Sequence, residues 1–474
     1  MRIVSAALLL LSLALAPAGA SELDLRLPDI GDPASRVLSP TSEQQLGDEI
    51  MQELRNQLPL VEDAEVRAYI EDLGARLASY SNRATYGFEF FVVDAPAINA
   101  FALPGGYIGV NSGLILAAEN ESELAGVMAH EIAHVTQRHI ARRMAAASRL
   151  NVRSIAMVLA GILIGTQDAQ AGQAAIMAGT AGTIQQQLNY SRAHEQEADR
   201  VGLKLLADAG YDPHGMPNFF GRLMDAARYA GRPPEYLSTH PMTQSRIADT
   251  AARAEGFATE DARESASFSL IRSKLLTLEE PPEQAAGIFR AALKKEGGDA
   301  AHYGLALVLT NTGRYDEARE QLDAISAALS EHPTVLAARA RLERRAGHPE
   351  HAEQLYRDGL SLYPGHLPLQ LELGELLLST GQADRAYALL ASEARRSNST
   401  ALQRLYAQAA RAANHPIEAR LAMADYYRLQ GDWHAALTQL DQVLEAQPTP
   451  HQAARASARQ AEIKQALQDA YSGR

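Results

Sequence analysis

The sequence contains no cysteine among its 474 residues. This absence excludes disulfide bonds, thiol catalysis and any cysteine-based metal site. A metal ion would therefore have to bind through histidine and carboxylate side chains. The apolar runs at residues 3–16 and 155–164 are both shorter than the roughly 20 residues that a helix needs to cross a bilayer.

Positive charge is also in short supply, with 44 Lys and Arg residues against 57 Asp and Glu residues and a formal net charge of −13. This balance argues against a nucleic-acid surface, so we expect no nucleic-acid partner. The hydrophobic content of 46% is ample for folded cores and is inflated by alanine, which favours closely packed helices over sheet. A chain of this length predicts two or more domains.

The first twenty residues have the pattern of a secretory signal peptide. Arg2 supplies one positive charge, an apolar stretch follows, and the segment Pro17-Ala-Gly-Ala20 places small residues before a cleavage point. A membrane anchor is the alternative, which the shortness of the apolar stretch disfavours. We therefore predict cleavage after Ala20 and export of a soluble mature chain, and the absence of cysteine excludes a lipoprotein anchor.

The pentapeptide His130-Glu-Ile-Ala-His134 carries the strongest chemical signal. Its neighbours are helix-forming residues without proline, and residues four apart lie on one face of a helix, so the two histidines can bind one metal ion. Glu131 lies one step further round and can accept a proton from water on that metal. This pattern is the zinc-protease signature. An ordinary solvated helix with two histidines is the alternative, and a third ligand would decide between them.

The segments around this helix predict a small α+β unit. Apolar residues at helical spacing between Ser42 and about Ser79, interrupted by Pro59, predict two helices. Residues 88–93 predict a strand, and residues 99–110 predict two short strands joined by a Pro-Gly-Gly turn. The region 155–187 predicts either a pair of buried helices or an apolar flap over the active site, and a surface that contacts a membrane is a further alternative.

An acidic segment at residues 189–202 offers the remaining ligand that a zinc site requires. Its composition predicts a helix on which Glu195 and Asp199, four residues apart, share a face. One can bind the metal while the other holds the outer nitrogen of a ligand histidine and fixes its tautomer. A solvated acidic face is the simpler interpretation of such a segment on its own. Three neighbouring side chains are interpreted as surface residues: His139, His194 and Glu197.

From about residue 265 a repeat with a period of 34 residues appears. The pattern Gly-x-x-x-x-Ala occurs at residues 313–318, 347–352 and 381–386. A fourth copy at residues 431–436 follows after 50 residues, so we expect one extra helix before it. This period is the tetratricopeptide signature, in which two helices per repeat stack into a superhelix with a concave binding face.

The two metal motifs together resemble the metallopeptidase family that includes HtpX and the CAAX prenyl proteases, a gluzincin group. With the signal peptide and the C-terminal repeats, nearly the whole mature chain resembles the periplasmic branch of that family, the BepA-like proteases of Gram-negative bacteria. The resemblance implies that His130, His134 and Glu195 bind one Zn²⁺ ion per chain. It also implies that Glu131 is the general base and that Asp199 supports a ligand histidine.

The resemblance implies roles for further residues. His240, followed by Pro241 and Arg246, matches a family histidine that can approach the zinc as an off switch. By its chemistry it can instead donate a hydrogen bond to the oxyanion of the reaction, and a loop histidine that caps a turn is the simplest interpretation. Substrate binding is expected beside a strand of the sheet, where an extended peptide can add as another strand, at Asn99, Gly105 and Gly106.

We therefore predict a mainly α-helical chain with three parts. Residues 1–20 are the signal peptide, residues 21–264 form an α+β zinc metalloprotease domain of gluzincin type with a small β-sheet, and residues 265–474 form an α-solenoid of tetratricopeptide repeats. The expected location is the periplasm, in association with the outer membrane.

The resemblance implies that the predicted metalloendopeptidase hydrolyses misfolded or stalled outer-membrane β-barrel proteins. The implied partner is the β-barrel assembly machinery, reached through the repeat domain. The alternative is a non-proteolytic chaperone or adaptor, because the binding array occupies more than a third of the chain. The complete set of ligands and base favours the protease.

Overall fold

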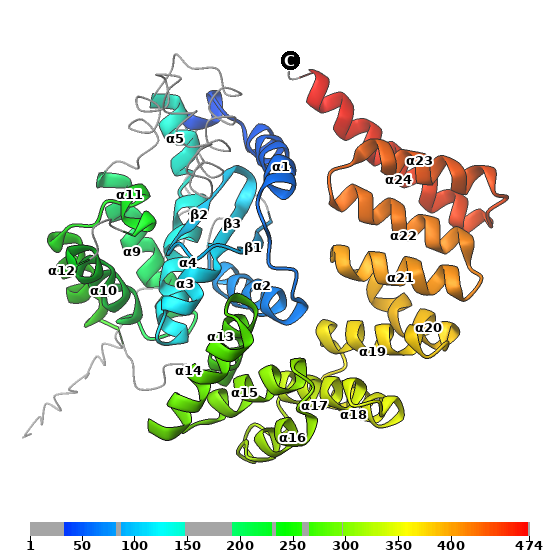
Figure 1. Cartoon of the computed structure of the whole chain (residues 1–474). Helices are drawn as coiled ribbons and strands as arrows, with labels where there is room; N and C mark the ends of the chain where they lie inside the picture. Colours follow the sequence, from blue (N-terminus) through cyan, green and yellow to red (C-terminus); the bar gives the residue numbers. More distant parts are fainter. Residues whose placement is uncertain are drawn as a thin grey trace, which may run out of the picture.

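The computed structural model describes residues 33–81, 87–146, 192–229, 234–257, 265–295 and 297–472. The predicted signal peptide and the region 155–187 lie outside these residues. Within the described part of the chain, no helix is both long enough and apolar enough to cross a membrane. The fold there is mainly helical with a small three-stranded sheet, as the sequence predicts (Figure 1).

Two helices precede the sheet, α1 (Pro40–Gln57) and α2 (Ala64–Ser79). Each begins after a capping residue whose side chain accepts hydrogen bonds from backbone N–H groups of the first turn, Ser39 for α1 and Asp63 for α2. Pro59 lies between the helices, as predicted, because proline cannot continue a helix. A short 3₁₀ turn at Pro33–Arg36 precedes α1.

The sheet consists of β1 (Glu89–Val93), β2 (Ala100–Ala102) and β3 (Tyr107–Asn111) in the order β1-β3-β2. The central strand β3 is parallel to β1 and antiparallel to β2. The predicted turn at Pro104–Gly106 joins β2 to β3, and Gly105 and Gly106 have φ values of 77° and 86° there. Such left-handed backbone conformations favour glycine.

The sheet is followed by α3 (Ser112–Ala117) and then α4 (Glu121–Thr136), which carries the two histidines of the pentapeptide. Every residue of α4 is buried. α9 (Arg192–Asp208) packs closely against α4, because a Cβ on Gly202 would lie 3.0 Å from backbone atoms of Ala129 and His130. This close approach brings the acidic residues of α9 to the histidines of α4.

The remaining helices of the first part surround this pair. They are α5 (His139–Ala146), α10 (Gly215–Tyr229), α11 (Glu235–Thr239) and α12 (Gln244–Ala254). One hydrophobic core joins α2, the sheet, α4, α9 and α10, with Ile70, Ile108, Met128 and Phe220 among its fully buried members. The predicted metal-binding motifs thus lie inside a packed core rather than on a loop.

The second described part is built of helices. In chain order these are α13 (Ala266–Glu279), α14 (Pro282–Lys295), α15 (Asp299–Asn311), α16 (Tyr315–Asp323), α17 (Pro333–Arg345), α18 (Pro349–Leu362), α19 (Leu367–Ser379), α20 (Ala383–Ala394), α21 (Thr400–Ala412), α22 (Pro416–Leu429), α23 (Trp433–Glu445) and α24 (Pro450–Ser472).

The predicted repeat is confirmed by the places where these helices end. Gly313, Gly347, Gly381 and Gly431 each have a positive φ between paired helices. Three helices, α20 to α22, lie between Gly381 and Gly431, which is one more than between Gly347 and Gly381, as expected. Asn414, with a φ of 59°, occupies the same kind of helix end between α21 and α22.

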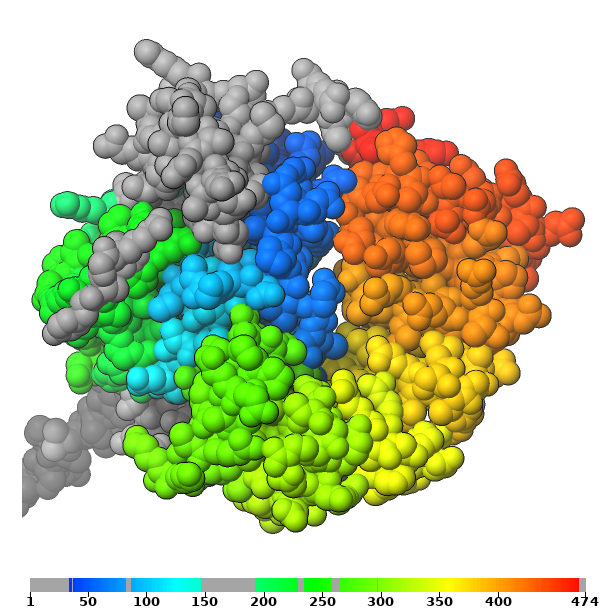
Figure 2. Space-filling model, viewed as in Figure 1, coloured from blue at the N-terminus to red at the C-terminus, as the bar shows by residue number. Residues whose placement is uncertain are grey.

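The repeats curve round the α1 and α2 side of the first part (Figures 1 and 2). At the near end, Lys274 of α13 is buried against Asp63 and Glu65 at the start of α2, and Arg341 of α17 also binds Glu65. At the far end, the side chain of Gln52 on α1 donates to the carbonyl of Gly431 at 2.8 Å. Residues of both parts line an open cavity of about 1050 Å³.

Candidate metal centre

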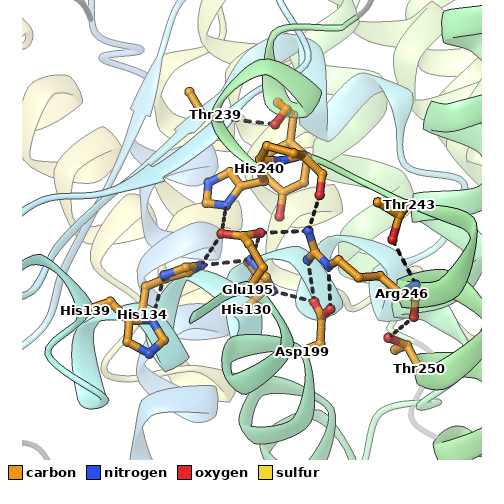
Figure 3. A network of polar contacts seen from close by, with 12 residues as sticks. His130, His134, His139, Glu195, Asp199, Thr239, His240, Thr243, Arg246 and Thr250 are labelled. Atoms are coloured by element: carbon orange, nitrogen blue, oxygen red, sulfur yellow. Dashed lines mark hydrogen bonds and ion pairs between the residues drawn. The ribbon is translucent and has the colours of Figure 1, made fainter. Parts of the chain in front are cut away.

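The buried site combines residues of α4, α9 and α12 with one residue that directly follows α11 (Figure 3). His130, Glu131 and His134 come from α4, and Glu195 and Asp199 come from α9. His240 follows the last residue of α11, and Arg246 lies in the first turn of α12. All seven side chains are buried.

Four side chains converge on one point. One ligand atom from each of His130, His134, Glu195 and His240 lies within 4.8 Å of all the others. The Nε2 atoms of His130 and His134 are 3.0 Å apart, and each faces the Glu195 carboxylate, at 3.6 and 3.5 Å respectively. His240 Nδ1 is 3.2 Å from Glu195 Oε1.

The carboxylate of Asp199 supports this group from behind. Its Oδ1 is 3.0 Å from Nδ1 of His130, the nitrogen that faces away from the other ligand atoms. The Arg246 guanidinium donates to both Asp199 oxygens at 2.7 Å and lies 2.8 Å from Glu195. A two-point contact of this kind fixes the orientation of the carboxylate, and through it the His130 ring.

The electrostatics of the pocket favour charged carboxylates at two positions and disfavour charge at a third. Burial alone would raise the pKa of Glu195 and Asp199, but neighbouring histidines and Arg246 outweigh it and lower both. Burial raises the pKa of Glu131. Burial also opposes protonation of His130, yet its contacts with Asp199 and Glu195 raise its pKa to about 9. Opposed shifts in one cluster are typical of a functional site.

The donor set fits a metal ion. Imidazole nitrogens and a carboxylate oxygen that converge in a buried pocket are the ligands that zinc and similar ions take in the absence of cysteine. Among the described residues, the buried Glu131 carboxylate has no closer charged neighbour than the ring of His240, whose Nε2 lies 3.5 Å from Glu131 Oε1. A buried carboxylate held only by such a long contact is costly, and a bound ion with its water would reduce that cost.

Comparison with known proteins agrees with this geometry. Residues 64–254 match the model of peptidase family M48, and residues 276–342 and 344–408 match a tetratricopeptide repeat model. The beta-barrel assembly-enhancing protease of Escherichia coli (strain K12) is 36% identical over 437 residues, which cover 90% of this chain and 88% of that protein. The chain belongs to peptidase family M48. It is a metallopeptidase, as the sequence predicts.

Two further relatives of this M48 peptidase span less of the chain. The beta-barrel assembly-enhancing protease of Yersinia pestis is 38% identical over 307 residues, or 64% of this chain and 63% of that protein. The mitochondrial metalloendopeptidase OMA1 of Schizosaccharomyces pombe is 31% identical over 179 residues, or 38% of this chain and 50% of that protein. The resemblance to the metallopeptidase family is thereby confirmed.

His240 of this M48 peptidase lies in the site rather than on an open loop. Its ring stacks on Tyr236 at a centroid distance of 4.7 Å, and its Nε2 is 3.5 Å from Glu131 Oε1. Tyr236, a fully buried tyrosine four residues before His240, was not among the predicted site residues. Its spacing of four residues, about one helical turn before His240, is the sequence signal that could have placed Tyr236 beside that histidine.

The three residues predicted to bind substrate lie in different surroundings. Asn99 is buried and donates a hydrogen bond to Glu235 of α11 at 2.9 Å. The backbone N–H of Tyr236 donates to the carbonyl of Ile98, so α11 is attached to the segment that leads into β2. Gly105 and Gly106 are buried, and Gly105 packs beside Gln44 of α1.

The interpretation of His139 as a surface residue is wrong. His139 has no exposed surface, and its Nδ1 lies 2.9 Å from Nδ1 of His134. Glu197 is half-buried beside it, and His194 stacks on its ring at a centroid distance of 4.5 Å. His194 and Glu197 are partly exposed, so only His139 contradicts the expectation. Its position was predicted from the spacing of one continuous helix, but α4 ends at Thr136 and a new helix begins at His139.

Proposed function

We propose that this chain is a zinc metalloendopeptidase in which His130, His134 and Glu195 bind one Zn²⁺ ion. The observation that carries this proposal is the convergence of these buried donors beside Glu131, within a chain that belongs to a metallopeptidase family. Two histidines and one glutamate are a common ligand set of catalytic zinc. A zinc ion held there supplies Lewis acidity, which polarises a carbonyl group and acidifies water.

Glu131 is proposed as the general base. It follows the first ligand on α4, is fully buried and has a pKa raised by burial, which brings its basicity closer to the working pH. In the proposed reaction Glu131 takes a proton from the attacking water and passes it to the departing amine. Asp199 holds the outer nitrogen of His130, and Arg246 holds Asp199 in turn.

We propose that His240 closes the site at rest. Its imidazole lies among the proposed ligands, 3.2 Å from Glu195, where it can act as a fourth donor. Stacking on Tyr236 holds the ring there. Donation of a hydrogen bond to the oxyanion of the reaction is the alternative role of the same residue once the site is open.

For substrates we propose misfolded or stalled outer-membrane β-barrel proteins in the periplasm. The support is the name of the Escherichia coli relative, which spans most of this chain, together with the signal peptide that the sequence predicts. An extended segment of such a client would add as a strand beside Asn99, Gly105 and Gly106. The repeat array at 265–474 would hold clients or the β-barrel assembly machinery, next to the cavity that it shares with the protease part at 21–264.

The experiment compares the full chain with Glu131→Gln, which keeps the shape of the side chain and removes the base. We expect wild-type protein loaded with zinc to cleave an unfolded β-barrel protein, and the variant to bind equimolar zinc but cleave at least about 10³-fold more slowly. Asp208→Asn, on the exposed end of the same helix as Glu195, is the matched control and should cleave normally. Full activity of Glu131→Gln would refute the proposed base.

A chaperone is the second candidate, and the size of the repeat array supports it. Cells that carry only Glu131→Gln distinguish the two functions. If assembly of β-barrel proteins is normal in these cells but fails in cells without the gene, the repeat array works without hydrolysis. If both strains fail alike, hydrolysis is the main function.

A further inference from the structure

His139 is brought to the metal site by a break in the helix that carries the ligands. α4 ends at Thr136, and Arg138 adopts a left-handed backbone conformation with a φ of 51° before α5 begins at His139. Non-glycine residues adopt this conformation only where their surroundings hold them. The Arg138 guanidinium is held by Glu43 at 3.1 Å and by the carbonyl of Leu38 at 2.6 Å.

The turn directs the His139 ring back onto His134. His139 Nδ1 lies 2.9 Å from His134 Nδ1, and its other nitrogen, Nε2, lies 3.2 Å from Glu197 Oε2 (Figure 3 shows the two rings). The same Glu197 oxygen accepts a hydrogen bond from Arg142 at 2.9 Å. A connected row of polar groups therefore leads from the metal site to the edge of the molecule.

Only one placement of protons satisfies this row when His134 acts as a ligand. A neutral histidine that binds metal through Nε2 carries its proton on Nδ1. His134 Nδ1 then donates to His139 Nδ1, which must accept, so the proton of His139 stands on Nε2 and is donated to Glu197. Arg142 keeps Glu197 an acceptor because it pairs with the ionised carboxylate.

We propose that His139 is a positioning residue that accepts the Nδ1 proton of His134 and so keeps the Nε2 lone pair of His134 directed at the metal. It supports His134 in the way that Asp199 supports His130. A neutral acceptor suits this position, because the pocket already holds the carboxylates of Glu131, Glu195 and Asp199 close together. The inference rests on the proposed ligand role of His134.

The test measures zinc affinity rather than turnover. Full-length protein is stripped of metal and titrated with Zn²⁺ against a chelating competitor, and binding of Co²⁺ is followed by its visible absorption. His139→Leu fills the space without an acceptor, and we expect zinc to bind about 10- to 100-fold more weakly. His139→Asn puts an amide oxygen near the position of Nδ1, and we expect affinity within about threefold of wild type.

Controls separate this inference from the function on which it rests. His214→Leu removes a half-buried histidine that pairs with Asp212 elsewhere and should leave zinc affinity unchanged. His134→Ala should abolish tight binding, and normal binding in that variant would refute the proposed ligand set itself. If His134→Ala loses zinc while His139→Leu retains wild-type affinity, only the positioning role is wrong.

Two further outcomes are decisive. A folded His139→Asn variant that binds zinc as weakly as His139→Leu would overturn the proposal, because acceptance of the proton would not be what matters. If His139→Leu does not fold, Glu197→Leu replaces it, because Glu197 is half-buried. Without Glu197, the acceptor that keeps the proton of His139 on Nε2 is lost, so Nδ1 is no longer held as the acceptor for His134. We expect that variant to bind zinc about 3- to 10-fold more weakly, and unchanged affinity would contradict the proposal.

Discussion

Replacement of Asp199 by asparagine tests how the site holds its ligands. One oxygen of Asp199 faces His130 Nδ1 at 3.0 Å, and both oxygens accept hydrogen bonds from Arg246 at 2.7 Å. An asparagine of the same shape has one acceptor and one donor group. Whichever way the amide turns, an N–H group faces a donor of Arg246, and the negative charge between the two partners is lost.

The expected magnitude follows from the partners that remain. Loss of the support for a ligand histidine typically weakens metal binding about 10- to 100-fold, or about 1.4 to 2.7 kcal/mol. Removal of one member of a buried ion pair costs about 3 to 5 kcal/mol of unfolding free energy. Arg246 keeps its contact with Glu195 at 2.8 Å, so we expect a smaller loss, about 2 kcal/mol.

The assay uses the full chain in the Glu131→Gln background, in which the proposed general base is absent. Zinc dissociation constants come from competition with a chelator, and stability comes from denaturant unfolding of the metal-free protein followed by circular dichroism. Asp208→Asn is the control, because Asp208 lies on the same helix but is exposed, and among the described residues its ion pair is with Lys204. If Asp199→Asn binds zinc as tightly as the control, the proposed support of His130 by Asp199 is refuted.

Two further predictions concern packing. A Cβ on Gly202 would lie 3.0 Å from the backbone of α4, so Gly202→Ala should displace α9, cost about 1 to 3 kcal/mol of unfolding free energy and weaken zinc binding. Gly221→Ala is the control, because a Cβ on Gly221 would meet no neighbouring atom within 4 Å, and it should stabilise the fold by up to about 1 kcal/mol. Equal effects of the two changes in unfolding and zinc titrations would contradict this account. Lys274→Met leaves Glu65 paired with Arg341 alone, and we expect the free energy of unfolding to fall by about 2 to 4 kcal/mol. Denaturant unfolding followed by circular dichroism checks it, and an unchanged midpoint would show that the buried pair does not stabilise the fold.

The sequence predicted the fold well where the pattern is local. Helices, strands and the Pro-Gly-Gly turn follow from spacing of apolar residues and from proline and glycine, and the period of 34 residues identifies the repeats before any contact is known. The extra helix before Gly431 was also predicted, because this glycine follows Gly381 after 50 residues instead of 34. The junction did not follow, because the pairing of Lys274 and Arg341 with Glu65 joins residues more than 200 positions apart.

In the candidate site, too, local motifs were predicted correctly and features that depend on distant contacts were not. The motif around His130 and the acidic segment around Glu195 identified the group that converges in space. His139 was misplaced because helical spacing was extended past Thr136, where the left-handed conformation of Arg138 turns the chain back. That conformation depends on contacts with Glu43 and Leu38, about 95 to 100 residues away, which the local sequence does not contain.

The measurement that tests the central claim most directly is a crystal structure of the zinc-loaded full chain, with anomalous diffraction recorded on both sides of the zinc absorption edge. The account predicts one strong peak per chain at about 2.0 to 2.2 Å from the Nε2 atoms of His130 and His134 and from an oxygen of Glu195, with His139 outside bonding distance. A zinc peak without one of these three ligands, or one bound to His139 and Glu197 instead, would contradict it.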